Sequence, residues 1–363
     1  MLGLRPLPRT LPAALRDITH ARVEVRLSAL RDLARLGQGQ QGEAARTALA
    51  TALTSDSSVA IRSEAAVALA DTDAREHLAA LVAAVDDAAP RVRQMAFVAL
   101  GELGGSERSD VAAAVRDAVR DPVAQIRFQA LIAAFKLLGA SESGPLIRHA
   151  FGDADDEVRY IAWRLAEDAW GGADALPEPV SAAAHRALED DSSAVRIAAA
   201  LLLSRHHDEA GEGMVVELLN HPSAALFPED EQAAIELCAE RALSEAMPGL
   251  ERRAFPGWSF SPSPARFSAL AALAALHHPR ARRELLRGLG AWTRDARTSA
   301  VAQVQRAGLV EALGELRRMA KDPTRADPEV VSSAIASLQR LRDESTGDDA
   351  ARGARAVVGD EAT

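Results

Sequence analysis

Apolar and polar positions follow a helical pattern along this chain, and the pattern restarts about every 34 residues. In VRQMAFVAL (92–100), IRFQALIAA (126–134) and VRIAAALLL (195–203), apolar residues recur three and four positions apart, which is the spacing of one face of an α-helix. Repeats of this length are typical of solenoids, in which each unit buries its apolar face against the next. The pattern therefore predicts an all-α array with almost no sheet.

An arginine in each segment fixes the register of the repeat. The anchor arginines are Arg26, Arg62, Arg93, Arg127, Arg159, Arg196, Arg266 and Arg297, and degenerate units at Glu231 and Val331 bring the number of units to ten. An alanine stands three residues after every anchor: Ala29, Ala65, Ala96, Ala130, Ala162, Ala199, Ala234, Ala269, Ala300 and Ala334. We predict that these alanines lie where two helices approach closely, so that a larger side chain there would force the helices apart.

The same helix face includes the residue seven positions after each anchor. These residues are Leu33, Leu69, Leu100, Ala134, Ala166, Leu203, Cys238, Leu273, Val304 and Leu338. Cys238 is therefore predicted to be a small apolar core residue and not a reactive thiol.

Five aspartates stand six residues before an anchor, in the loop that enters the anchor helix. The pairs in sequence are Asp56 with Arg62, Asp87 with Arg93, Asp121 with Arg127, Asp153 with Arg159 and Asp190 with Arg196. An aspartate in such a loop can accept hydrogen bonds from free backbone N–H groups and can pair with an arginine of its own or of the adjacent unit. We predict a ladder of charge-assisted bonds between successive loops. From residue 205 onward the equivalent positions are Ala225, Phe260, Ala291 and Arg325.

Each anchor helix is followed by a turn and by a second amphipathic helix, as in REHLAALVAAV (75–85). The expected architecture is a right-handed α-solenoid of about ten helical hairpins over residues 20–342. Residues 1–19 form a predicted N-terminal capping segment. Residues 343–363 are expected to be a disordered acidic tail, because their composition is polar.

The pattern DxxxxVRxxAxxAL resembles the short HEAT-like repeats of the kind named after phycobilisome lyases. The resemblance spans roughly residues 20–342, and it is strongest from Asp56 to Ser204. It implies an α-solenoid whose curved surface binds other proteins, that is, a scaffold or adaptor. A tetrapyrrole lyase or regulatory subunit like the phycobilin lyases is one alternative that the same resemblance allows.

Composition and charge limit the classes of protein to which this array can belong. Hydrophobic residues make up 48% of the 363 residues but aromatic residues only 4%, as expected of helices packed through small side chains. The net charge of −10 argues against a general nucleic-acid coat. One cysteine and no long apolar segment at the start or elsewhere lead us to expect a soluble, cytoplasmic protein.

No catalytic, cofactor or metal motif stands out in the sequence. GQGQQG (37–42) satisfies GxGxxG, but it follows a helical segment and not a strand, so we expect a turn. The pairs His206/His207 and His277/His278 cannot chelate a metal by themselves, because adjacent helical residues point about 100° apart. We therefore predict a non-enzymatic protein without a cofactor or metal.

A basic segment is the most informative functional signal. Residues 241–325 hold 15 Lys/Arg against 7 Asp/Glu, whereas residues 1–240 hold 23 against 37. The candidate partner-binding residues on its second helices are Arg252, Arg253, Arg280, Arg282, Arg283, Arg287, Arg317 and Arg318. They predict a stripe for a protein partner with an acidic surface. An ordinary solvated face is the alternative.

A nucleic-acid function remains a further alternative. HEAT-like DNA glycosylases, which the array resembles, hold DNA in a basic groove with tryptophans and an aspartate, and Trp258, Trp292 and Asp295 lie near these arginines. The acidic chain lacks an extended basic groove, which disfavours this alternative.

Overall fold

The computed structural model describes residues 9–39, 42–105, 107–221, 226–255 and 265–360, with side chains described as far as Glu344. Within these ranges the chain forms helices and no strand. It divides into two compact units, Met1–Ala183 and Ala184–Thr363. The all-α solenoid expected from the repeat is confirmed.

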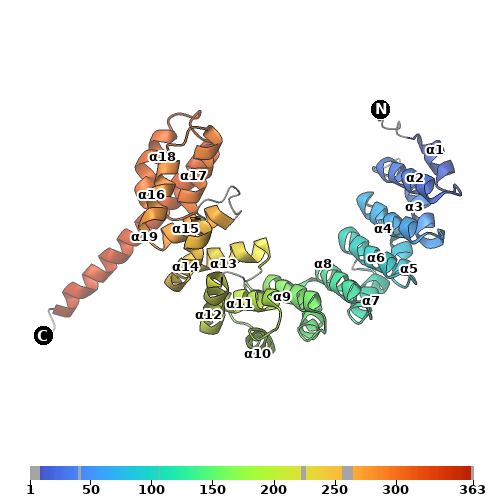
Figure 1. Ribbon diagram of the computed structural model, residues 1–363, viewed down its shortest axis with the longest axis horizontal. Coiled ribbons are helices and arrows are strands. Elements are labelled where there is room, and N and C mark those ends of the chain that lie inside the picture. The colour runs from blue at the N-terminus through green and yellow to red at the C-terminus, as the bar shows by residue number, and fades with distance from the viewer. Residues whose placement is uncertain (1–8, 40–41, 106, 222–225, 256–264, 361–363) are drawn as a thin grey trace. The chain divides into compact units, whose positions relative to one another are not determined.

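The N-terminal unit consists of successive helices that pack on the helices of the next repeat (Figure 1). First helices pack in the order α2, α4, α6 and α8, and second helices in the order α3, α5 and α7. The bounds are α1 Leu11–Asp17, α2 Val23–Leu36, α3 Glu43–Ser55, α4 Val59–Asp71, α5 Leu78–Ala84, α6 Pro90–Leu103, α7 Ser109–Ala118, α8 Ala124–Ala150 and α9 Asp156–Trp170.

The C-terminal unit repeats this arrangement, with first helices α11, α13, α15, α17 and α19 packing in turn. Its helices are α11 Ser193–Arg205, α12 Glu209–Asn220, α13 Pro228–Glu240, α14 Met247–Ala254, α15 Ala265–Ala275, α16 Pro279–Gly288, α17 Arg294–Arg306, α18 Leu313–Met319 and α19 Pro328–Asp360. Helix α10, Glu178–Ala187, spans the boundary between the two units. Short 3-10 turns precede α5, α14 and α18 at Arg75–His77, Ser244–Ala246 and Val310–Ala312.

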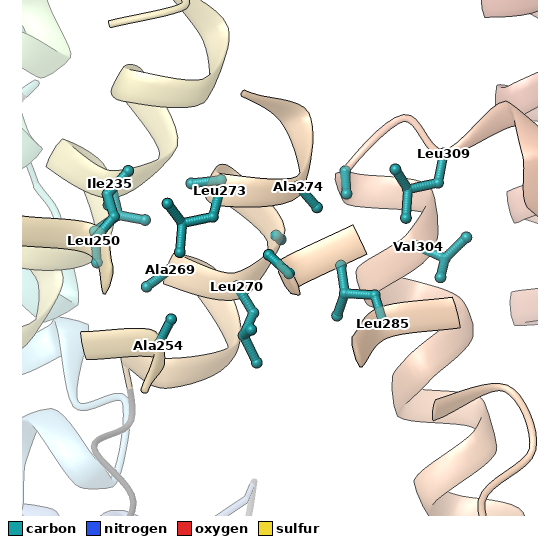
Figure 2. Packing of buried hydrophobic residues seen from close by; sticks show 14 of the residues in the cluster. Ile235, Leu250, Ala254, Ala269, Leu270, Leu273, Ala274, Leu285, Val304 and Leu309 are labelled. Atoms are coloured by element: carbon teal, nitrogen blue, oxygen red, sulfur yellow. The ribbon is translucent and has the colours of Figure 1, made fainter. Parts of the chain in front are cut away.

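The core lies on the helix face that the repeat predicts. All ten residues at the seventh position after the anchors are buried, and Figure 2 shows Leu273 and Val304 among the packed side chains of the C-terminal unit. Nine of the ten alanines at the third position have no exposed surface. Ala300 is the exception, because it is half-buried while the next residue, Val301, is fully buried.

The turn after several first helices places one residue in the left-handed region of backbone space. The residue eleven positions after the anchor has positive φ at Asp73, His207, Ala242 and His277, and also at two glycines. Aspartate and histidine are enriched in this region because their side chains tolerate it better than most. The turn thus accounts for the positions of His207 and His277.

Helix α8, Ala124–Ala150, comprises both helices of one hairpin. By length and composition it would be apolar enough to cross a membrane. Gly139, with φ of 73°, breaks it into two helices, and these pack against α6, α7 and α9 as other hairpins of the unit do. The apolar character of α8 is therefore that of a core hairpin in the repeat.

Both ends of the chain carry additional helix. In the segment expected to cap the array, α1 packs on α2, and Arg9 pairs with Asp17 at 2.9 Å and with Asp32 at 3.0 Å. At the other end, α19 carries the tenth anchor position, Val331, and continues to Asp360. It thus includes residues 343–360 of the segment 343–363 for which the sequence predicts disorder, and that disorder stays a prediction.

Candidate partner-binding surface

In the N-terminal unit, arginines and aspartates of successive loops are joined by two hydrogen bonds each. Arg93 Nε and Nη2 donate to the two carboxylate oxygens of Asp121 at 3.1 and 3.2 Å. The same geometry occurs at Arg26–Asp56, Arg62–Asp87 and Arg127–Asp153. Each pair joins an anchor to the loop of the following unit. We call these four pairs the rungs.

Each rung is also fixed to the backbone at both ends. Arg93 Nη1 donates to the carbonyl oxygen of Asp87 in its own loop at 3.0 Å. Asp121 Oδ1 accepts from the Val123 amide at 2.8 Å, which closes a turn of the kind that aspartate favours. The arginine and aspartate of this rung are each 14% exposed. The rung therefore fixes the shape of two neighbouring loops.

The rungs at Asp87 and Asp153 stabilise the charged form of the carboxylate. The hydrogen bond from Arg62 lowers the pKa of Asp87, and this effect outweighs burial, which acts in the opposite direction. For Asp153, burial raises the pKa most strongly, but the hydrogen bond from Arg127 and the bond from the Asp155 amide together keep it below its usual range. Charge-assisted bonds of this kind are stronger than neutral ones.

The last predicted pairs lie at the boundary between the two units. Arg159 donates to the carbonyl oxygen of Asp153 at 2.9 Å, within the N-terminal unit. In the C-terminal unit, Asp190 Oδ1 accepts from the Ser192 amide at 2.9 Å, and Arg196 donates to the Asp190 carbonyl oxygen. The local contacts of the loop thus continue into the C-terminal unit.

Where the aspartates are replaced, the anchors use other acceptors. Arg297 donates to the carbonyl oxygens of Ala291 in its own loop and of Arg325 in the following one. Arg266 pairs with Glu284 at 2.8 Å. Two of the replaced positions, Ala225 and Phe260, lie outside the described residues.

Five of the eight arginines proposed for the stripe already have contacts within the C-terminal unit. Arg252 donates to the carbonyl oxygens of Leu219 and Asn220 at the end of α12. Arg253 pairs with Glu231 at 2.7 Å, and Arg282 pairs with Glu311 at 2.7 Å. The other two are Arg280, whose guanidinium lies 3.9 Å from the centre of the Phe255 ring, and Arg318, which pairs with Glu315.

The remaining three arginines of the stripe are exposed. Arg283 and Arg287 lie on α16 and Arg317 lies on α18, and within the described part of the chain none of the three has a carboxylate or carbonyl partner. The stripe predicted from sequence is thus divided into five arginines that already have a partner inside the C-terminal unit and three exposed arginines that have no carboxylate or carbonyl partner in the described residues. The second group is the more available to a partner protein.

The sequence analysis missed contacts between second helices. In the N-terminal unit, Arg46 of α3 pairs with Glu76 in the 3-10 turn before α5. In the C-terminal unit, Arg282 of α16 reaches Glu311 in the 3-10 turn before α18. The signal that would have found them is a glutamate at the second position of REHLAAL (75–81) and of VEALGEL (310–316), about one repeat after an arginine on the preceding second helix.

The other candidate groups have structural environments. Cys238 is buried, and burial raises its pKa to about 12, so it is a protonated core thiol at neutral pH. His207 lies against Arg241 and His277 against Arg282. The described residues contain no cluster of three side chains able to hold a metal ion. GQGQQG begins at Gly37, the residue that ends α2.

The aromatic residues considered for DNA have different surroundings. Trp292 is 98% exposed in the loop between α16 and α17, and Asp295 is exposed in the first turn of α17. Trp258 lies outside the described residues. Trp292 and Asp295 are therefore both exposed, and they stand three residues apart in the sequence.

The family to which the repeats belong follows from comparison with known sequences. The model of the family described as HEAT repeats matches residues 47–136, which hold the anchors Arg62, Arg93 and Arg127. Residues 47–136, about a quarter of the chain, thus match the pattern of HEAT repeats. The hairpins of the C-terminal unit continue the same period and bury the same positions as these HEAT repeats. A search of curated protein sequences gave no significant match.

Solved structures with the same kind of fold share little sequence with the chain. YibA of Escherichia coli is 16% identical with a TM-score of 0.51, over 74% of this chain and 93% of YibA. A homology model of the AP-3 complex is 14% identical with a TM-score of 0.55, over 83% of this chain and 58% of that one. The CpcE–CpcF complex of phycocyanin lyase from Nostoc is 18% identical with a TM-score of 0.42, over 76% and 97%. At such identities the likeness concerns the fold.

Proposed function

We propose that this protein is a non-enzymatic, cytoplasmic scaffold that binds an acidic partner protein through the exposed arginines of its C-terminal unit. The HEAT-repeat fold supports a role in protein interaction. The observation that supports the site is the exposure of Arg283, Arg287 and Arg317, while most other arginines of the stripe are used within the fold. Guanidinium groups without an internal acceptor suit carboxylates on a partner.

Charge distribution favours a protein partner over nucleic acid. The chain as a whole carries a net charge of −10, so a long polyanion would be repelled by most of it. An acidic segment of a protein needs only a local basic surface. Such a surface mainly accelerates association and selects against wrongly charged partners.

The test is affinity capture from native lysate, with mass spectrometry of the captured proteins. The variant Arg283→Glu/Arg287→Glu is compared with Arg91→Glu/Arg120→Glu, which makes the same change in net charge at exposed arginines of the N-terminal unit. We expect the first variant to lose specific partners ~10-fold or more and the second to retain them. Equal capture by wild type and both variants, with unchanged circular dichroism, would refute the basic surface.

The structure also improves the choice of substitutions. Replacing Arg252 or Arg318 with glutamate would break contacts to α12 or to Glu315. A loss of binding in those variants could then come from altered folding as well as from a lost contact with the partner. Arg283 and Arg287 avoid this ambiguity because their side chains are exposed.

A further inference from the structure

An apolar groove lies beside the exposed arginines of α16. It is formed by α15, α16 and α17 and encloses about 350 Å³, a volume at the lower end of those of ligand sites. Its apolar lining includes Phe267, Leu270, Leu285 and Ala300. The groove therefore has room for one large side chain.

One aromatic side chain of the groove lining is exposed, and a second exposed aromatic residue follows the lining in sequence. Phe267, which lines it, is 49% exposed. Trp292, which is 98% exposed, directly follows the lining residue Ala291. Large aromatic side chains seldom stay in water without a reason, and tryptophan is strongly enriched at the centres of protein interfaces.

A residue that lines the groove carries a polar atom without a partner. Gln303 of α17 lines the groove, and its Oε1 is buried without a hydrogen-bond donor in the described part of the chain. A buried acceptor without a donor is costly, so native structures rarely keep one unless something else supplies the donor. Because this oxygen is buried, a backbone N–H of a bound segment reaches it only when the Gln303 side chain turns into the groove.

The charge around the groove selects its occupant. The segment from Pro279 to Thr298 contains six arginines and two carboxylates. Arg287 is exposed and stands one residue before Gly288, which lines the groove, whereas Glu284 on the same helix is held by Arg266. An acidic segment thus gains favourable contacts at the rim, and a basic one would be repelled.

We propose that this groove binds an acidic segment of a partner protein by accepting one large apolar side chain between Phe267 and Leu285, with the Gln303 side chain turning into the groove to accept a backbone N–H. The inference rests on the proposed function and defines the chemistry of the partner. Arg283 and Arg287 attract the carboxylates on either side of this side chain, and the apolar groove favours an apolar side chain over a polar one.

The test uses the full chain and two short fluorescent peptides of glutamate and serine, one with a single central phenylalanine and one with serine in its place. Fluorescence anisotropy should show ~10-fold tighter binding of the phenylalanine peptide, as expected for burial of one aromatic side chain. Phe267→Ser and Ser299→Phe, which remove or fill the apolar space at exposed positions, should abolish this preference.

Gln303→Leu gives a readout that a merely structural role would not produce. Removal of the unsatisfied acceptor should raise the melting temperature, whereas loss of the acceptor for the bound segment should weaken the phenylalanine peptide several-fold. A fall of stability and affinity together would contradict the role given to Gln303.

The outcomes separate the groove from the basic surface. Equal binding of both peptides, weakened by Arg287→Glu, would overturn the groove and leave the proposed function standing. No binding of either peptide at millimolar concentration would also overturn the groove. Tighter binding of a duplex DNA oligonucleotide than of the phenylalanine peptide would overturn a protein segment as the occupant. If the phenylalanine peptide binds but Arg283→Glu/Arg287→Glu does not affect capture from lysate, the proposed function fails instead.

Discussion

In the N-terminal unit Arg93 reaches the carboxylate of Asp121 in the next loop, whereas in the C-terminal unit Arg297 reaches the carbonyl oxygen of Arg325 in the corresponding loop. Both arginines also bind a carbonyl oxygen six residues upstream, at Asp87 and Ala291. The arginine thus has the same place in both units, and only the chemistry of its acceptor in the next loop differs.

The comparison shows which part of the repeat is essential to the array. The buried positions seven residues after the anchors are kept in both units, so packing of the first helices sets the architecture. The loop acceptor can change from a carboxylate to a carbonyl group. In the C-terminal unit, where residues 241–325 hold 15 Lys/Arg against 7 Asp/Glu, three exposed arginines of the second helices have no carboxylate or carbonyl partner in the described residues.

The largest expected effect concerns the close contacts between first helices. Ala96 has no exposed surface, so Ala96→Leu should destabilise the protein by about 3 kcal/mol because the added side chain must separate two helices. Ala300→Leu at the equivalent, half-buried position of α17 should cost less than about 1 kcal/mol. Chemical denaturation measures both, and equal losses would contradict the difference in packing.

Substitutions in the rungs should have the next largest effect on the stability of the protein. Asp121→Ala should cost about 1 to 3 kcal/mol, because Arg93 is left poorly solvated without its carboxylate. Arg297→Met, which removes contacts to carbonyl groups only, should cost about 1 kcal/mol. Melting midpoints that fall equally for the two variants would mean that the carboxylate adds nothing to the contact.

A smaller effect, of opposite sign, is expected in the turn after α13. Ala242 has φ of 54°, a conformation that costs a residue with a side chain about 1 kcal/mol and costs glycine almost nothing. Ala242→Gly should therefore stabilise the protein by up to about 1 kcal/mol, offset in part by the greater freedom of glycine in the unfolded chain. Thermal melting would contradict the assignment if the glycine variant were clearly less stable.

The smallest expected change in stability appears only at acidic pH. The folded-state pKa of Asp87 is lowered, so its contribution to stability is complete above the unfolded pKa of about 3.9 and is lost as pH falls through the folded value. The free energy of unfolding should thus decrease below pH ~4, and less steeply in Asp87→Asn. Identical slopes in urea titrations of wild type and variant across this range would contradict the lowered pKa.

Much of the fold could be predicted from sequence because the period is set by packing. The alanine after each anchor and the apolar residue four positions later are repeated because helices of neighbouring units approach at the same points. Loop pairing was harder to predict. An aspartate six residues before an arginine can pair within its own unit or with the adjacent one, and only the structure shows that Asp121 pairs with the preceding anchor, Arg93.

Less of the candidate site than of the fold could be predicted from the sequence. A run such as PRARRELLRGLG shows the charges but not their acceptors, which lie about one repeat away, as for Arg282 and Glu311. The groove was missed for a related reason. Phe267, Leu285 and Gln303 come from three different helices, and their meeting depends on how α15, α16 and α17 pack.

Arginine-selective labelling with phenylglyoxal, followed by peptide mass spectrometry, tests most directly whether the N-terminal anchor arginines are held in rungs while Arg283, Arg287 and Arg317 are accessible. The account predicts rapid modification of Arg283, Arg287 and Arg317 and slow modification of Arg62 and Arg93. Modification of the rung arginines at the same rate as Arg283 would contradict it.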